Sequence, residues 1–227
     1  MQTLILLHGA IGSASQLQSV KIELEKKFEV HCLEFSGHGS TPFQAEFSIA
    51  QFANELENAF IKWGDCPVFG YSMGGYVALY HALHYGRKNH PVFTLGTKFK
   101  WDPEIAAKES KMLNPEKIAE KIPAFAQLLE ARHPAYGWKK VLGSTAEMML
   151  RMGEKNPLSM DDFKSISNPC QISIGDRDEM VTLSETLEVY QSLPHSSLLV
   201  FPETKHPIEK VNTQRILMEA ELFFQSR

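Results

Sequence analysis

The chain has 227 residues, of which 43% are hydrophobic and 22% are charged, and its formal net charge is -4. This length suits one domain with a full core, and the composition and weak negative charge exclude a typical nucleic-acid-binding protein. No stretch approaches the roughly 20 apolar residues that a membrane span requires, so no membrane span is predicted.

The N-terminal ten residues, MQTLILLHGA, are apolar but lack a leading basic part, which predicts a core strand and not a signal peptide. The three cysteines, Cys32, Cys66 and Cys170, are few and far apart. They predict buried thiols, not a disulfide scaffold or a metal site. Together these features predict a cytoplasmic protein.

Six short apolar runs are nearly continuous, which is typical of strands buried on both faces. Longer amphipathic stretches separate most of these runs and predict helices. The alternation predicts an α/β fold with a mostly parallel sheet of about six strands and helices on both faces. The strands are expected at 3–7, 30–35, 68–71, 92–95, 171–174 and 198–201, and the helices near 14–27, 48–63, 73–86, 182–192 and 207–225.

Residues 98–165, called the lid segment below, hold no clear strand and several helix starts. Asp102 and Asn114 each precede a proline, as a capping residue does, and 144–147 reads as a capping box. We expect three or four helices here, inserted between the fourth and fifth strands. No flexible linker surrounds them, so the lid segment is expected to pack on a core made of 1–97 and 166–227 within a single structural domain.

The stretch Gly70-Tyr71-Ser72-Met73-Gly74 fits the pattern G-x-S-x-G between an apolar strand and a helical run. In such a turn the serine adopts a strained conformation that exposes its hydroxyl. Glycines two residues away on either side prevent steric clashes, and the helix N-terminus favours negative charge on a substrate. The alternative is a glycine-rich turn with an incidental serine.

At this point the chain resembles the α/β-hydrolase superfamily. Its motifs extend from residue 8 to residue 207, and Ser, Asp and His follow in the family's order. The first strand begins at residue 3, so the leading hairpin of many members is not expected. The matching motifs are His8-Gly9, Gly37-His38-Gly39 with its flanking serines, Gly70–Gly74, the segment 175–181, and Lys205-His206-Pro207.

The resemblance implies a triad of Ser72 as nucleophile, His206 as base and Asp178 as the acid that orients the imidazole. His206 and Asp178 both follow predicted strands, where ligand sites form in parallel sheets. Asp176 is a rival for Asp178, although the family pattern favours the second aspartate. Asp176 is otherwise expected to cap its turn or to pair with Arg177.

The resemblance also implies that the backbone N–H groups of Ala10 and Met73 form the oxyanion hole. His8 and His38 are expected to shape their loops. No metal or cofactor site is expected.

Several aromatic residues and methionines of the lid segment are candidates for contact with an apolar substrate group. The alternative is that they form the lid segment's own core, as apolar residues at helical spacing commonly do. The candidates are Phe99, Trp101, Trp138 and Met149.

These patterns predict a serine hydrolase that cleaves a small carboxylic ester, thioester or lactone and needs no cofactor. Its partner is a small-molecule acyl substrate, and no oligomeric state is indicated. Activity should fall below about pH 6–7, because the base must be neutral. Two alternatives stay open: non-hydrolytic chemistry with the same triad (C–C cleavage, elimination or acyl transfer), and a ligand receptor that uses the pocket.

Overall fold

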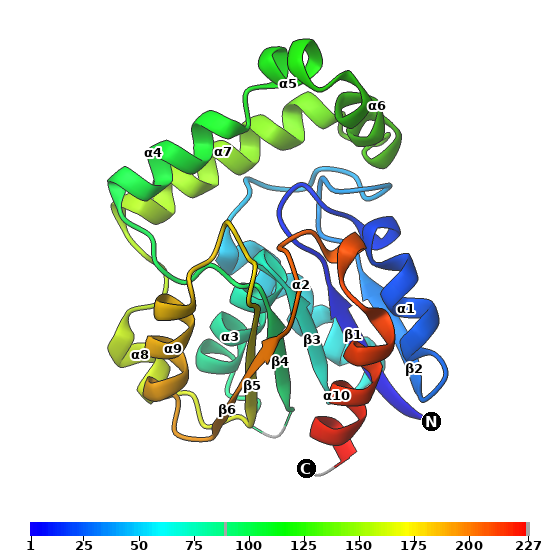
Figure 1. Ribbon diagram of the computed structural model, residues 1–227, viewed down its shortest axis with the longest axis vertical. Coiled ribbons are helices and arrows are strands. Elements are labelled where there is room, and N and C mark those ends of the chain that lie inside the picture. The colour runs from blue at the N-terminus through cyan, green and yellow to red at the C-terminus, as the bar shows by residue number, and fades with distance from the viewer. Residues whose placement is uncertain (89, 226–227) are drawn as a thin grey trace.

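The computed structural model describes residues 1–88 and 90–225 and contains one six-stranded sheet (Figure 1). All pairings between its strands are parallel, in the order β2-β1-β3-β4-β5-β6. The predicted parallel sheet of about six strands is therefore confirmed. The strands are β1 (Gln2–Leu7), β2 (Phe28–Leu33), β3 (Val68–Tyr71), β4 (Val92–Leu95), β5 (Cys170–Gly175) and β6 (Ser196–Phe201).

Helices cover both faces of this sheet, and a further group lies beyond its carboxyl ends (Figure 1). None of the helices in the described part of the chain has the length and apolar character of a bilayer span. The α-helices are α1 (Gln18–Leu24), α2 (Ile49–Trp63), α3 (Met73–His84), α4 (Pro103–Met112), α5 (Pro115–Lys121), α6 (Pro123–Arg132), α7 (Trp138–Glu154), α8 (Met160–Lys164), α9 (Leu183–Ser192) and α10 (Thr213–Gln225), with short 3-10 helices at Ala14–Leu17 and Ile208–Lys210.

The central strands are buried on both faces, as their continuous apolar runs predict. In β1, Ile5 and Leu7 join the cluster under α2 and α3, whereas Leu4 and Leu6 join the cluster under α1 and α10. All four side chains are inaccessible to solvent. Each such burial contributes roughly 1.5–3 kcal/mol, so the two clusters fix the helices to the sheet.

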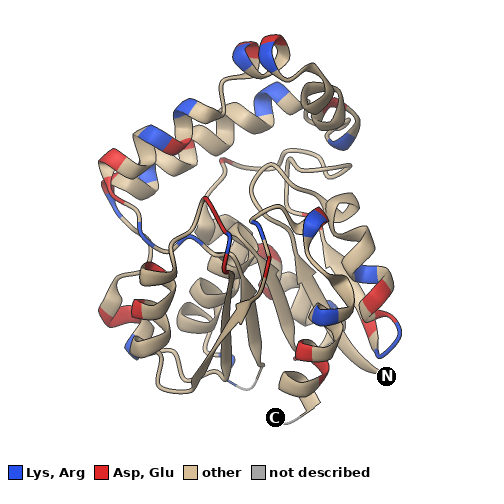
Figure 2. Ribbon diagram, viewed as in Figure 1, with Lys and Arg blue, Asp and Glu red and all other residues tan. Residues whose placement is uncertain are grey.

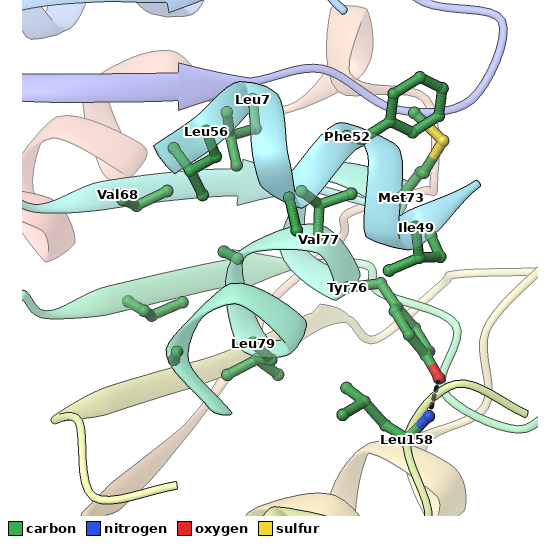
Figure 3. Packing of buried hydrophobic residues seen from close by; sticks show 14 of the residues in the cluster. Leu7, Ile49, Phe52, Leu56, Val68, Met73, Tyr76, Val77, Leu79 and Leu158 are labelled. Carbon is green, nitrogen blue, oxygen red and sulfur yellow. Dashed lines mark hydrogen bonds between the residues drawn. The ribbon is translucent and has the colours of Figure 1, made fainter. Parts of the chain in front are cut away.

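Figure 3 shows the first cluster from close by, with Phe52 and Leu56 of α2 lying near Val77 of α3. Tyr76 points from α3 toward the stretch that follows α7. Its hydroxyl accepts a hydrogen bond from the backbone N–H of Leu158 at 2.9 Å. The helix that follows the serine turn is thereby tied to the end of the lid segment.

The lid segment contains five helices, α4 to α8, one more than the upper limit of the prediction. Helices α4 and α7 run side by side and, with α5 and α6, form a layer above the carboxyl ends of the strands (Figure 1). The short α8 instead packs against α9. The two predicted caps are confirmed, because the side chains of Asp102 and Asn114 accept N–H bonds from Ile105 and Lys117, each at 2.8 Å.

The capping box predicted at 144–147 is wrong, since these residues lie inside α7. The helix begins after Gly137, whose φ of 90° sets the turn that precedes it. A continuous apolar stripe on α7 then overrides the local capping pattern. The buried residues of α7 are Trp138, Val141, Leu142, Thr145, Met148, Met152 and Gly153.

Candidate active site

The sheet order places a crevice at the carboxyl ends of β1 and β3. The chain goes from β1 to β2 on one side and then to β3 on the other, so the loops that follow β1 and β3 lead away from each other. Parallel α/β sheets bind their ligands at such a switch point. The stretches that follow β1, β3, β5 and β6 carry the candidate site residues at this edge.

Ser72 lies in the turn between β3 and α3 with φ 51° and ψ -118°, a backbone conformation that residues other than glycine rarely adopt. Two glycines make this turn possible. A Cβ at Gly70 would lie 2.5 Å from the Cα of Gly75, and a Cβ at Gly74 would lie 2.5 Å from the carbonyl oxygen of Leu7. The second close approach is therefore to β1, and not to the strand that precedes the serine.

His206 and Asp178 form a direct pair, with His206 Nδ1 2.8 Å from Asp178 Oδ2. The other carboxylate oxygen accepts the N–H groups of Met180 at 2.8 Å and Val181 at 2.9 Å. Burial acts to raise the pKa of Asp178, but the bonds from His206 and the two amides outweigh it and lower this pKa. The pair is thus an imidazole held by a carboxylate that stays ionised.

Asp176 lies outside this pair. Its Oδ1 accepts the backbone N–H of Thr204 at 3.0 Å and so caps the turn, one of the two roles expected for it. The other expected role, a pair with Arg177, is not observed, because Arg177 makes its salt bridge with Glu203 at 2.9 Å.

Three residues that sequence reasoning missed support the site. The hydroxyl of Tyr71 donates to the carbonyl of His206 at 3.1 Å, and that of Thr97 donates to the carbonyl of Ser72 at 3.0 Å. Gly96, with φ 63°, leaves room for the carboxylate–imidazole pair, because a Cβ there would lie 3.3 Å from both partners. For Gly96 and Thr97, the sequence signal that could have indicated this role was their position directly after the buried strand β4.

His8 and His38 shape the neighbouring loops. The Nδ1–H of His8 donates to the carbonyl of Gly9 at 2.8 Å, and its Nε2 accepts the N–H of Phe35 at 3.2 Å. Both bonds form only with a neutral imidazole. His38 donates from Nδ1 to the carbonyl of Ser36 at 3.1 Å. The two rings lie 4.9 Å apart, so protonation of both would place like charges side by side in the core.

Buried histidines should make the fold sensitive to acid. Desolvation lowers the pKa of His8 to about 4 and that of His90 to about 3. The unfolded chain, with an ordinary histidine pKa near 6.5, then binds more protons than the folded one below that pH. We expect the free energy of unfolding to decrease between pH 6.5 and 4, by about 1.4 kcal/mol per pH unit for each such residue.

Urea unfolding at graded pH tests this expectation. His90→Leu removes one of these titrating groups far from the candidate site. It should reduce the slope of the unfolding free energy against pH by the contribution of one proton, about 1.4 kcal/mol per pH unit. An unchanged slope in this variant would contradict the assignment.

A cavity of about 260 Å³ joins the candidate residues. Ser72 and His206 line it, as do Ala10 and Met73, the expected oxyanion donors. Its wall is largely apolar and includes residues from α4, α6 and α7. Apolar residues of this wall include Ile11, Ile49, Trp101, Leu113, Phe125, Met148, Met149, Met152, Met180 and Val181.

The four lid-segment candidates divide into two pairs. Trp101 and Met149 line the cavity, whereas Phe99 and Trp138 do not. Phe99 is 4% exposed and packs edge-on against Phe163, and Trp138 belongs to a small cluster between α5, α6 and α7. Trp138 therefore stabilises the lid segment itself, as the alternative proposed, whereas Phe99 belongs to the main core cluster under α2 and α3 and contacts Tyr76.

Two ion pairs border the cavity. Lys98 Nζ lies 3.6 Å from Glu109 Oε1, and Arg132 Nη2 lies 3.3 Å from Glu209 Oε1. Each positive side chain is therefore balanced by a carboxylate. Within residues 1–88 and 90–225, no group of three or more His, Cys, Asp or Glu side chains could hold a metal ion.

Comparison with known proteins places these features in a family. The family model "Thioesterase domain" matches residues 2–207. Two relatives are pimeloyl-[acyl-carrier protein] methyl ester esterases. The protein from Aeromonas hydrophila is 29% identical over 41% of this chain and 37% of its own length, so the match spans well under half of that relative. The protein from Vibrio parahaemolyticus is 24% identical over 89% of this chain and 86% of its own.

Among solved structures, a thermophilic esterase from Thermogutta terrifontis superposes with a TM-score of 0.78 at 18% identity. The match covers 100% of this chain and 90% of that one. At this identity the likeness shows a shared fold.

Proposed function

This chain is an enzyme that belongs to the thioesterase-domain family of α/β hydrolases, and we propose that it cleaves small carboxylic esters or thioesters through an acyl-enzyme on Ser72. The observation that carries this proposal is the 2.8 Å bond between His206 and Asp178, at a cavity that His206 shares with Ser72. A serine hydroxyl needs a base to become nucleophilic, and an imidazole oriented by a carboxylate is such a base.

In the proposed reaction, Ser72 Oγ forms a bond to the acyl carbon and gives its proton to His206 Nε2. The electron pair of the carbonyl moves to its oxygen and makes an oxyanion. When the oxyanion collapses, the alcohol or thiol leaves with the proton from His206. Water then repeats the sequence and releases the acid. Asp178 keeps the proton of the neutral ring on Nδ1, so that Nε2 can accept one.

We assign the oxyanion hole to the backbone N–H groups of Ala10 and Met73. Both residues line the cavity. Met73 is the first residue of α3, where the helix N-terminus favours negative charge. Removal of one such donor typically costs about 100–1000-fold in rate, so the reaction depends on the geometry of these two backbone groups as well as on the triad.

The substrate class follows from the cavity. Its volume of about 260 Å³ and its methionine- and aromatic-rich wall suit a small apolar acyl or alcohol group. We propose that the lid segment acts as a lid over this cavity, with Trp101 and Met149 in contact with the substrate. Charged residues of both signs are distributed along the helices of the lid segment (Figure 2). The relatives' names add the methyl ester of an acyl chain on a carrier protein as one candidate.

We also propose that the protein works in the cytoplasm. All three cysteines are free thiols, and Cys66 and Cys170 are buried. Burial raises the pKa of both thiols to about 12, which keeps them protonated and unreactive. Unpaired, buried thiols are typical of proteins that fold in a reducing compartment.

A fluorophosphonate probe tests the proposed nucleophile without a guess about the substrate. Ser72 Oγ should attack the phosphorus and displace fluoride, and mass spectrometry should find one adduct on the peptide that contains Ser72. The Ser72→Ala protein should stay unlabelled. A panel of p-nitrophenyl esters and acyl thioesters of increasing chain length then defines the acyl group. Absence of both labelling and turnover would reject the proposed function.

A further inference from the structure

The carbonyl of Ile11 accepts two hydrogen bonds from the lid segment. His133 donates to it from Nε2 at 2.9 Å, and Arg132 donates from Nη1 at 3.3 Å. Ile11 directly follows Ala10, whose N–H is a proposed oxyanion donor. Arg132 and His133 are more than a hundred residues away from Ile11 in the sequence. They nevertheless bind the loop that carries this proposed oxyanion donor.

Ile11 needs such support because its backbone is strained. Its φ is 52°, in the left-handed region that a β-branched residue rarely adopts. It is part of a tight turn that the N–H of Gly12 closes onto the carbonyl of Gly9 at 3.1 Å. Strained backbone persists only where surrounding contacts hold it, and here two of those contacts are side chains of the lid segment.

Both ring nitrogens of His133 form hydrogen bonds to the backbone. Its Nδ1 accepts the backbone N–H of Gly39 at 3.0 Å while Nε2 donates to Ile11. The side chain is 1% exposed. Because one nitrogen accepts and the other donates, both bonds require the neutral ring with its proton on Nε2. Burial lowers the pKa of His133 and so favours that form.

Arg132 extends the connection to the histidine loop. Its second guanidinium nitrogen lies 3.3 Å from Glu209, three residues beyond His206. The side chain of Gln16 donates to the same carboxylate oxygen at 3.2 Å. The junction between α6 and α7 therefore contacts the loops that follow β1, β2 and β6, three of the loops that surround the candidate site.

We propose that His133 is a positioning residue for the reaction: it holds the Gly9–Gly12 turn so that the N–H of Ala10 stays directed at the oxyanion. This inference rests on the proposed function and adds a role for the lid segment besides substrate contact. Without His133 the turn can relax toward ordinary backbone angles, and the donor moves. A displacement of about 1 Å in a catalytic group can cost about 100-fold in rate.

The test compares three variants of the full chain. His133→Ala should lower kcat for p-nitrophenyl esters by about 10–100-fold with KM within about threefold. His133→Gln should recover most of kcat, because its amide can donate to Ile11 and accept from Gly39. His81→Ala is the matched control. Its side chain is also buried and bonded, to Glu57 at 2.9 Å, but lies far from the site, so kcat should stay near that of the wild type.

A trifluoromethyl ketone gives the second readout. Ser72 Oγ adds to its carbonyl carbon, the proton passes to His206, and the resulting oxyanion needs the same donors as the reaction. Its inhibition constant should rise in His133→Ala by about the same factor by which kcat/KM falls. A purely structural role would lower the melting temperature but leave this constant unchanged.

The outcomes separate the two proposals. If the wild type is labelled by fluorophosphonate but His133→Ala matches His81→Ala in kcat and ketone binding, the positioning role is overturned and the proposed function stands. If the wild type neither reacts with the probe nor turns over esters, the proposed function fails, and the inference fails with it.

Discussion

Replacement of Ser72 by alanine should lower kcat by about 10⁶-fold, because it removes the proposed nucleophile and with it the proposed covalent route. The cavity and the pair of His206 and Asp178 stay in place, so KM should change little. Initial rates of ester hydrolysis, measured with enzyme purified free of wild-type carry-over, test this expectation. Residual activity above about 1% would show that another group attacks the substrate.

The backbone of Ser72 adds a second expectation, for stability. At φ 51° and ψ -118°, alanine keeps the strain that serine has, whereas glycine relieves it. Ser72→Gly should therefore be as inactive as Ser72→Ala but more stable by about 1–3 kcal/mol. Urea unfolding of the two variants measures the difference. Equal stabilities would mean that the turn stores no strain, which would remove one reason to regard it as a nucleophile turn.

Much of the fold could be predicted because its signals are local. The run at 68–71 reads as a strand buried on both faces, and the glycines at 70 and 74 show where backbones come close. The strand β2 was placed about two residues too late. The apolar residues Leu33 and Phe35 extended the predicted run, but the sheet pairing starts at Phe28 and ends at Leu33. Pairing with β1 decides the register, and a single run carries no information on it.

The lid segment was predicted less well, because its packing partners are distant in sequence. The sequence around Trp138 does not indicate that its side chain packs against α5 and α6, nor does the sequence around Met149 indicate that this side chain lines the cavity. Likewise, the bond from His133 to Ile11 joins residues that only the docked helices bring together. Local patterns predicted the caps at Asp102 and Asn114, which depend on neighbouring residues alone.

Asp178→Asn should reduce kcat by about 10⁴-fold. One oxygen of Asp178 accepts the N–H groups of Met180 and Val181. In the asparagine variant, these two donors require the amide oxygen on their side. The amide NH₂ then faces Nδ1 of His206 and donates to it, which moves the proton of the neutral ring to Nε2. That nitrogen can no longer accept the proton of Ser72, although the geometry of the site is preserved.

Asp176→Asn is the matched control, with the same substitution two residues earlier in the same loop. Its amide oxygen can still accept the N–H of Thr204, so kcat should stay within about threefold of the wild type. The pKa of Asp178 is lowered by its bonds to His206 and to two backbone amides, so its carboxylate stays ionised and keeps orienting the imidazole across the working range. If Asp176→Asn proved the more damaging change, the acid of the triad would have to be reassigned to Asp176.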